Sequence, residues 1–261
     1  MNLQRHPLLY GSIPWVLPVL LLAVWEAGTR VGWISDRVLP APFAIVQSFV
    51  ALTLSGELWG HLKTSCWRAL SGFGIGAGVG IVLGFWTGTS HLMERFLDTS
   101  VQMIRNVPHL ALTPLVILWF GIGEEAKIFL IALGVMFPVY LNTFHGIRSV
   151  DRQLIEMGRA YGLDRWKLFR DVILPGALPS ILVGIRFGLG VMWLTLIVAE
   201  TIAASSGLGY MAMNARELLQ IDIVVLAILL YALLGKLADY LARVLEERWL
   251  RWHPNYQRAA G

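Results

Sequence analysis

RALSGFGIGAGVGIVLGFWTGT, residues 68–89, is an apolar run in which glycine recurs every four residues. A helix needs about 20 mostly apolar residues to cross the hydrocarbon core of a bilayer, so the run predicts a membrane span. Glycines four apart share one helix face, and each costs about 1 kcal/mol relative to alanine. Five in register therefore indicate close approach of a neighbouring helix, either as tight packing or as a sliding surface. The stripe consists of Gly72, Gly76, Gly80, Gly84 and Gly88.

Composition extends this prediction to the whole chain. Of the 261 residues, 56% are hydrophobic and 15% are charged, whereas soluble domains carry about 25% charged residues. The apolar residues fall into six runs, which predict an all-α, polytopic membrane helix bundle forming a single transmembrane domain over residues 1–261. The expected spans are 12–31, 68–89, 97–120, 126–146, 184–204 and 222–242. The third is the least regular, because its first half is polar and Pro108 and Pro114 interrupt it.

Several functional classes find no support in the sequence. A net charge of +4 is too small to indicate a nucleic-acid binder, and the lone Cys66 cannot form a disulfide within the chain. The six histidines show no metal-binding H-x-x-x-H spacing, and Gly235-Lys236 lacks the rest of a P-loop. We therefore expect no catalytic site, metal or cofactor on this chain. A proton-coupled secondary transporter is an alternative, but inverted repeats typical of that class are not evident.

The distribution of basic residues predicts the orientation. Six spans place both termini on one side, and cytoplasmic segments of membrane proteins are enriched in Lys and Arg. With the N-terminus inside, 14 of the 21 Lys and Arg residues fall in cytoplasmic segments, among them Arg5 and Arg258. We therefore expect both termini and the segment 147–183 to be cytoplasmic.

Segment 147–183 is the longest cytoplasmic connection and predicts two short helices with an elbow. Asp151 can cap a helix that runs to about Tyr161, and Gly162 can take the left-handed conformation that closes it. Asp164 can cap a second helix through Val172, which Leu174-Pro175 is expected to end. Trp166 and Phe169 give that helix an aromatic face, typical of an interface anchor. The alternative is an amphipathic element lying on the inner leaflet.

The same segment resembles the EAA motif of ABC importer permeases. The matching positions are Glu156, Gly162, Val172, Leu174 and Pro175, whereas Met157 and Gly158 stand where the motif has two alanines. Segments 105–129, 183–218 and 229–239 are similar to the nitrate, sulfonate and taurine branch, and most similar to permeases for aliphatic sulfonates. The resemblance covers nearly the whole chain.

This resemblance implies a type I ABC importer permease fold and a location in the bacterial inner membrane. It implies that the loop, through Glu156, Gly162, Asp164, Trp166, Phe169, Leu174 and Pro175, couples the chain to a cytoplasmic ATPase that binds ATP and Mg. The expected assembly is a homodimer with two ATPase subunits and a periplasmic substrate-binding protein, surrounded by membrane lipid. The expected substrate is an aliphatic sulfonate, with taurine or nitrate as alternatives.

Polar residues at membrane depth are candidates for the translocation pathway, because they are costly there unless they face a pathway or each other. They are Arg105, Asn106, His109, Thr113, Asn142, Trp193 and Glu200. Hydrogen-bond donors among them, with the charge of Arg105, would suit a sulfonate anion. The structural alternatives are a headgroup position for Arg105, an internal histidine at His109 and a helix bridge at Asn142. Glu200 would repel an anion, so we expect a structural or gating role in which it pairs with Arg216.

Overall fold

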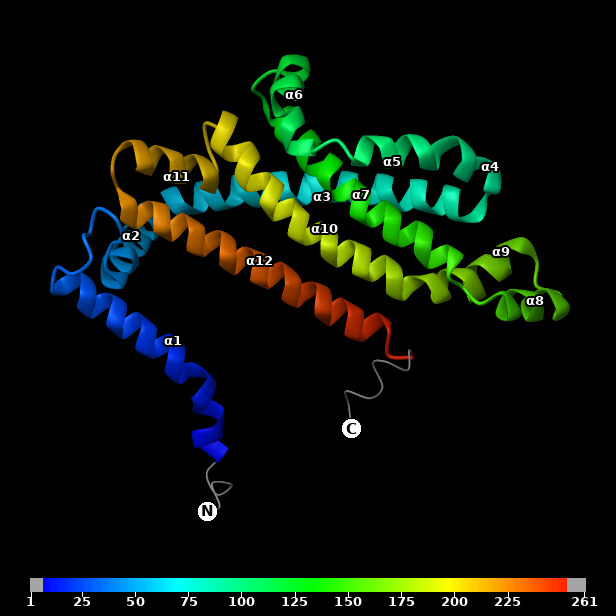
Figure 1. Cartoon of the computed structure of the whole chain (residues 1–261), viewed down its shortest axis with the longest axis horizontal. Helices are drawn as coiled ribbons and strands as arrows, with labels where there is room; N and C mark the ends of the chain where they lie inside the picture. The colour runs from blue at the N-terminus through cyan, green and yellow to red at the C-terminus, as the bar shows by residue number, and fades with distance from the viewer. Residues whose placement is uncertain (1–6, 253–261) are drawn as a thin grey trace.

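The computed structural model describes residues 7–252, and every regular element in that part of the chain is a helix. Four long helices lie along the molecule: α3 (Glu57–Thr89), α7 (Glu124–Arg148), α10 (Leu174–Ala203) and α12 (Ile221–Trp249) (Figure 1). All four are long and apolar enough to cross a membrane. The predicted all-α membrane bundle is confirmed.

Helix α7 is the centre of the bundle, packed against α3 on one side and α10 on the other. The glycine stripe of α3 makes the first contact possible. A Cβ added at Gly72 would lie 2.6 Å from Cβ of Ile131, and one added at Gly80 would lie 2.7 Å from the carbonyl oxygen of Met136. A Cβ at Gly74 or Gly78, off the stripe, meets nothing within 4 Å. The stripe therefore brings two helix backbones into direct contact, as expected from small residues at membrane helix interfaces.

The third expected span, 97–120, is not one straight helix. The chain forms α4 (His91–Met93), a π-turn (Glu94–Asp98) and α5 (Thr99–Arg105), then a 3₁₀ turn (His109–Leu112) and α6 (Thr113–Phe120). The segments 91–105 and 109–120 meet at 80°. Pro108 explains the break, because it cannot donate a helical hydrogen bond and it restricts the residue before it. Within residues 7–252 the bent pair makes five candidate spans if it counts as one.

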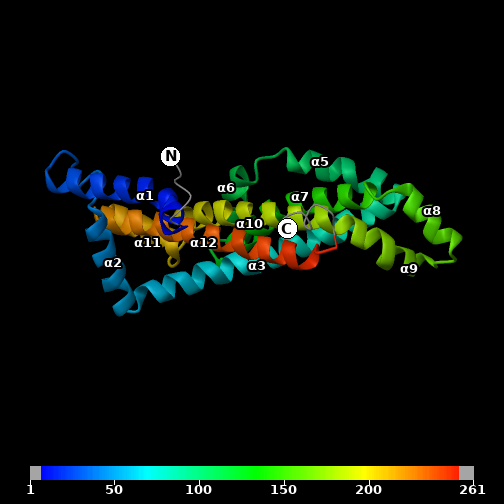
Figure 2. The same cartoon turned by 90° about the horizontal axis from the view of Figure 1, so that it is seen from below.

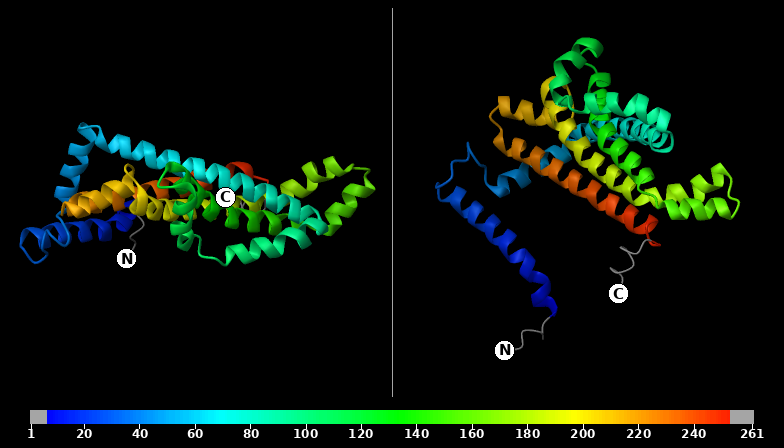
Figure 3. Two further views of the ribbon diagram at one scale, coloured as in Figure 1. Left: turned by 90° about the horizontal axis from the view of Figure 1, so that it is seen from above. Right: turned by 45° about the vertical axis from the view of Figure 1, so that its right-hand side comes forward.

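All but the last residue of the first expected span, 12–31, falls in α1 (Pro7–Arg30), which joins the body through α2 (Pro42–Leu54). Figures 1 and 3 show α1 set apart from the four long helices. Side chains before Val16 are outside the described residues, as are Arg5 and Arg258. The sixth span and the side on which the termini lie therefore stay predictions.

Two groups of short helices lie at opposite ends of the body. Helices α8 (Arg152–Ala160) and α9 (Arg165–Leu168) project from one end, whereas α2 and α11 (Leu208–Glu217) lie at the other (Figures 1 and 2). This separation places the segment 147–183 and the segment that follows α10 far apart along the direction of the long helices.

Candidate functional site

The projecting segment begins with a helix closed at both ends. The side chain of Asp151 accepts a hydrogen bond from the backbone N–H of Gln153 at 2.8 Å, so it is the N-cap of α8. Gly162 has φ of +77°, and its N–H donates to the carbonyl of Arg159 while the next N–H donates to that of Gly158. This pair of bonds is a Schellman motif, which requires the left-handed conformation that glycine adopts without strain. The predicted cap and elbow are both confirmed.

The second helix continues into the membrane. Asp164 caps α9 by accepting from the backbone N–H of Lys167 at 2.7 Å, as expected. The expected stop at Leu174-Pro175 is wrong: α9 runs through a π-turn (Phe169–Ile173) directly into α10. A proline normally removes one helical bond and clashes with the carbonyl four residues earlier. The wider π-turn just before Pro175 accommodates that residue, so the chain is helical from Arg165 to Ile202.

The apolar side chains of this loop divide into an inner and an outer set. Phe169 packs edge-on against Phe85 of α3, with ring centroids 4.6 Å apart. Trp166 lies 6.0 Å from Phe169 but is 68% exposed. Helix α8 and its C-cap residue add a second exposed set, Leu154, Met157 and Tyr161. These three were not among the predicted interface residues, although their spacing of three and four residues places them on one helical face.

The inner face of the loop is packed firmly onto the bundle. Val150 is buried with Ile147, Ala177 and Ile181, and Ile155 of α8 packs against this cluster. A Cβ added at Gly158 would lie 2.7 Å from Cδ1 of Leu168, so the glycine allows α8 and α9 to approach closely. The departure from the EAA pattern at Gly158 thus has a packing reason in this chain.

A buried network of ion pairs lies at the end of the bundle opposite α8 and α9. Arg68, whose side chain is 0% exposed, donates to Glu200 at 2.7 Å and to both carboxylate oxygens of Glu124 at 2.5 and 2.6 Å. It also donates to the carbonyl and the hydroxyl oxygen of Ser206 at 2.6 and 3.1 Å. A guanidinium has five N–H groups, and here all five have acceptors.

Both carboxylate oxygens of Glu200 also accept hydrogen bonds from other groups. Its carboxylate accepts from the hydroxyls of Ser65 and Tyr231, each at 2.8 Å, and from the backbone N–H of Gly209 at 2.9 Å. The expected pair of Glu200 with Arg216 is therefore wrong. Helix α3 approaches the end of α10 closely, whereas Arg216 lies exposed on α11.

Sequence reasoning did not identify this network, although one signal for it was present. Arg68 opens the most glycine-rich apolar run of the chain. An arginine at the edge of a span needs a carboxylate partner if it is buried. The partner is 132 positions away in the sequence, and only the fold brings it close.

The remaining candidate pathway residues do not form one cluster. Arg105 and Asn106 lie exposed at the end of α5, and Thr113 is buried, with its hydroxyl donating to the carbonyl of Leu110. Nε2 of His109 lies 3.1 Å from the hydroxyl of Thr195 on α10. Asn142 donates to the carbonyl of Pro138 within α7. Whether any of them contacts substrate stays a prediction.

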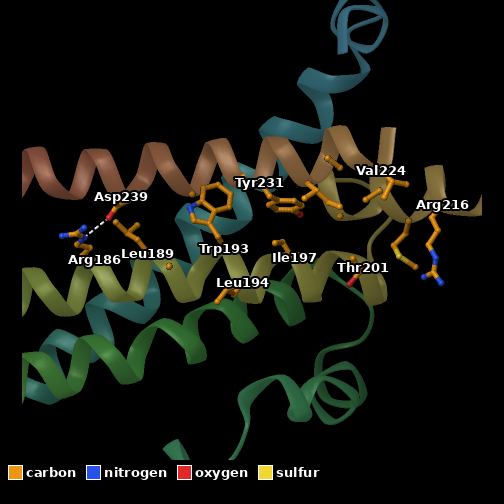
Figure 4. Close-up of a pocket in the computed structure, with 18 residues that line it drawn as sticks. Arg186, Leu189, Trp193, Leu194, Ile197, Thr201, Arg216, Val224, Tyr231 and Asp239 are labelled. Carbon is orange, nitrogen blue, oxygen red and sulfur yellow. Dashed lines mark hydrogen bonds and ion pairs between the residues drawn. The ribbon is translucent and has the colours of Figure 1, made fainter. Parts of the chain in front are cut away.

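Trp193 lies in the wall of a groove. A groove of about 510 Å³ runs between α10, α11 and α12, with mostly apolar walls (Figure 4). Arg186 lies at one end, hydrogen-bonded to Asp239 of α12 at 2.8 Å, and Arg216 at the other. The indole Nε1 of Trp193 is buried and has no hydrogen-bond partner among the described residues.

Comparison of the amino-acid sequence with known proteins points to one family. Residues 78–251 match the sequence pattern of the family described as "Binding-protein-dependent transport system inner membrane component". An Escherichia coli K12 chain named an aliphatic sulfonates transport permease protein, SsuC, is 65% identical over 93% of this chain and 92% of its own. The Bacillus subtilis 168 chain of the same name is 50% identical over 93% and 88%. The taurine transport system permease protein TauC of Escherichia coli K12 is 37% identical over 91% and 88%.

Solved structures agree on the fold. An amino acid ABC transporter with histidines is similar over 77% of this chain and 97% of its own, with a TM-score of 0.64 and 18% identity. The MetNI methionine ABC transporter in an inward-facing conformation is similar over 79% and 98%, with a TM-score of 0.53 and 21% identity. At these identities the likeness concerns the arrangement of helices alone.

Proposed function

Since the chain belongs to the family of binding-protein-dependent transport system inner membrane components, we propose that it is the permease subunit of an ATP-driven importer of aliphatic sulfonates. Two of its relatives carry the name aliphatic sulfonates transport permease, at 65% and 50% identity. Relatives named as permeases are not themselves enzymes. ATP and Mg therefore belong to a partner subunit in this proposal.

The observation that carries the coupling role is the unbroken helix from Arg165 to Ile202. One end of that helix is held beneath α8 by the Gly162 elbow, and the other end reaches the buried Arg68–Glu200 network. Pro175 and Pro179 lack the N–H of a helical hydrogen bond, but the segment remains one helix, so its two ends are mechanically connected. A push on the loop by a closing ATPase is thereby transmitted along α10 to the opposite end of the bundle.

The proposed assembly contains two copies of this chain, two ATPase subunits and a periplasmic substrate-binding protein. Each chain carries one projecting loop of this kind, so two docked ATPases call for two permease chains. The excess of Lys and Arg in the segments on the loop side supports a cytoplasmic position for α8 and α9. Both termini are then cytoplasmic, in a multi-pass protein of the inner membrane.

Uptake by the reconstituted complex tests this function. Proteoliposomes with the permease, its ATPase and its binding protein should accumulate ethanesulfonate and longer alkanesulfonates only when ATP is present inside. Taurine and nitrate, offered separately, test the two related substrates. Uptake that depends on a proton gradient and not on ATP would instead indicate a secondary transporter.

Gly162→Val tests the coupling loop within that assay. A valine forced into the left-handed region costs roughly 1–2 kcal/mol or redirects α9. ATPase retention or sulfonate-stimulated hydrolysis should therefore fall, while the membrane bundle stays folded. Gly74→Val is the matched control, because Gly74 lies in a helix with open space around its Cβ position. Equal hydrolysis and uptake in both variants would remove the coupling role from this loop.

A further inference from the structure

The break between α5 and α6, residues 103–108, is exposed along its whole length. Every side chain in it is exposed, from the last turn of α5 through Pro108. Its backbone is irregular, because α5 ends at Arg105 and the 3₁₀ turn begins only at His109. The segments on either side of it meet at 80°, and no part of the described chain covers it.

Contacts on both sides of the break indicate its depth. Before it, Tyr140 of α7 donates to Asp98 at 2.8 Å. After it, Nε2 of His109 would lie 3.0 Å from a Cβ added at Gly134 of α7. These two residues of α7 are eight and fourteen positions from Arg148, its last residue, or about 12 and 21 Å along the helix. Because α5 runs along the long helices (Figure 1), the break lies between these levels, near the middle of a helix long enough to cross the membrane.

The hydrocarbon core of a bilayer does not tolerate such a segment. The last turn of a helix leaves carbonyl groups without helical partners, and α5 ends in this way at membrane depth. Irregular backbone at that depth occurs where it is buried in protein or lines a water-filled cavity, and not where it faces lipid. The break also lies too far from the end of α7 to be at the headgroups. Water or another protein surface therefore faces it.

The break supplies positive charge without a compensating carboxylate. The side chains of Arg105 and Asn106 have no hydrogen-bond or ion partner among the described residues. A guanidinium inside the membrane is costly unless it is paired or hydrated. The stretch from Thr99 to Phe120 contains no Asp or Glu. A second copy that met the break through the same surface would therefore bring another Arg105 and no acidic partner, so an anion is the partner that this surface lacks.

We propose that Arg105 and Asn106 bind the sulfonate group of the transported anion as it passes the break, in a water-filled pathway enclosed by two copies of the chain. The parallel N–H groups of a guanidinium match two oxygens of an anionic group, and the amide adds a further donor. Met103, Ile104 and Val107, exposed beside them, offer apolar contacts to the alkyl chain. This inference rests on the proposed function and gives it a binding site on the permease.

Cysteine labelling tests whether the break faces water and prefers anions. The sample is the permease–ATPase complex in nanodiscs, with Val107→Cys in a Cys66→Ser background. This thiol should react about tenfold faster with sulfonatoethyl methanethiosulfonate than with the trimethylammonioethyl reagent, after each rate is divided by that of a free thiol. Butanesulfonate should slow the reaction. Arg105→Gln should abolish both the preference and the protection.

Val79→Cys is the matched control for labelling. Val79 and Val107 are equally exposed, at 42% each. The neighbouring Gly80 lies against Met136 of α7, so the control position has a similar depth. It belongs to the regular helix α3 and not to a break. This thiol should react with neither charged reagent.

Uptake tests whether the charge at this depth serves transport. Arg105→Gln should lower butanesulfonate uptake about tenfold or more, as expected from the loss of a hydrogen bond to a charged group, without lowering the yield of folded complex. Arg105→Lys should recover part of the uptake. Arg95→Gln is the control, because Arg95 is exposed on the same segment and has no ion partner among the described residues. Its neighbour Glu94 pairs with Arg148 at the end of α7, so Arg95 lies outside the membrane centre.

The outcomes separate this inference from the proposed function. If Val107→Cys is as unreactive as Val79→Cys, the break is covered by protein and lines no pathway. If it reacts without a charge preference, or if the preference survives Arg105→Gln, no anion site exists there. Either result overturns the inference, while ATP-driven sulfonate uptake by the parent complex would leave the proposed function standing. Absence of that uptake would remove the function itself.

Discussion

Arg68 joins three parts of the chain at the α11 end of the bundle. It contacts Glu200 at the end of α10, Glu124 at the start of α7 and Ser206 before α11. Removing one member of a buried charge pair leaves the other charge desolvated and unpaired. The remaining Glu200 carboxylate would keep only its neutral donors.

Arg68→Gln should therefore destabilise the chain by about 3–5 kcal/mol. The measurement is thermal unfolding of the detergent-solubilised protein. Arg216→Gln is the control, because that arginine is exposed and has no ion partner among the described residues. Equal unfolding temperatures in the two variants would show that the buried network contributes nothing to stability.

Gly207 supports the same network through its backbone. It has φ of +109°, and an added Cβ would lie 2.6 Å from Nη1 of Arg68. Both the conformation and the space therefore require glycine at this position. The collision involves a side chain from another helix, so no local pattern around Gly207 reveals it.

At the scale of elements, the contact between α3 and α7 depends on a helix face without side chains. Gly76 lies directly against the backbone of Ala132, whereas Gly78 faces open space. The two glycines are two positions apart on the same helix. They therefore have nearly the same depth in the membrane and the same helix propensity, and they differ in what their helix face packs against.

Gly76→Leu should prevent the bundle from assembling, because a leucine would hold apart two backbones that now touch. Gly78→Leu should be tolerated. The readout is the yield of monodisperse protein after detergent extraction, together with sulfonate uptake. Normal yield and uptake for Gly76→Leu would contradict the packing seen here.

The projecting loop offers a second comparison, between two aromatic side chains with different surroundings. Trp166→Ala removes an exposed interface side chain and should weaken ATPase binding by about 2 kcal/mol, or roughly thirtyfold. Phe169→Ala should instead loosen the loop from Phe85 of α3 and lower stability. ATPase retention on a column and thermal unfolding, measured for both, distinguish the two effects. If Trp166→Ala retains the ATPase as the parent does, α9 is not part of the interface.

At the scale of the whole molecule, the proposed orientation has α8 in the cytoplasm and α11 at the outer surface. In a Cys66→Ser background, Tyr161→Cys and Leu218→Cys put single exposed thiols on the two ends. A membrane-impermeant maleimide added to spheroplasts should label Leu218→Cys and should label Tyr161→Cys only after the membrane is permeabilised. The reverse pattern would invert the orientation and separate the loop from a cytoplasmic ATPase.

Features that depend on a few neighbouring residues were predictable from the sequence. The helical bundle follows from the length and spacing of the apolar runs, and the Asp151 and Asp164 caps and the Gly162 elbow follow from side-chain and backbone chemistry within one helical turn. The EAA spacing located the same loop. Such interactions form whatever the rest of the chain does, so they can be recognised without knowledge of its neighbours.

Features that join distant residues were decided only by the tertiary structure. One local expectation also failed, because the proline at Pro175 was expected to end a helix, but a π-turn just before it let the helix continue. The partner of Glu200 is Arg68 and not the nearby Arg216, and the groove at Trp193 arises where two helices separated in sequence face each other. A buried charge or a cavity depends on which helices are neighbours and how they are rotated. That choice results from packing over the whole bundle, and no local pattern records it.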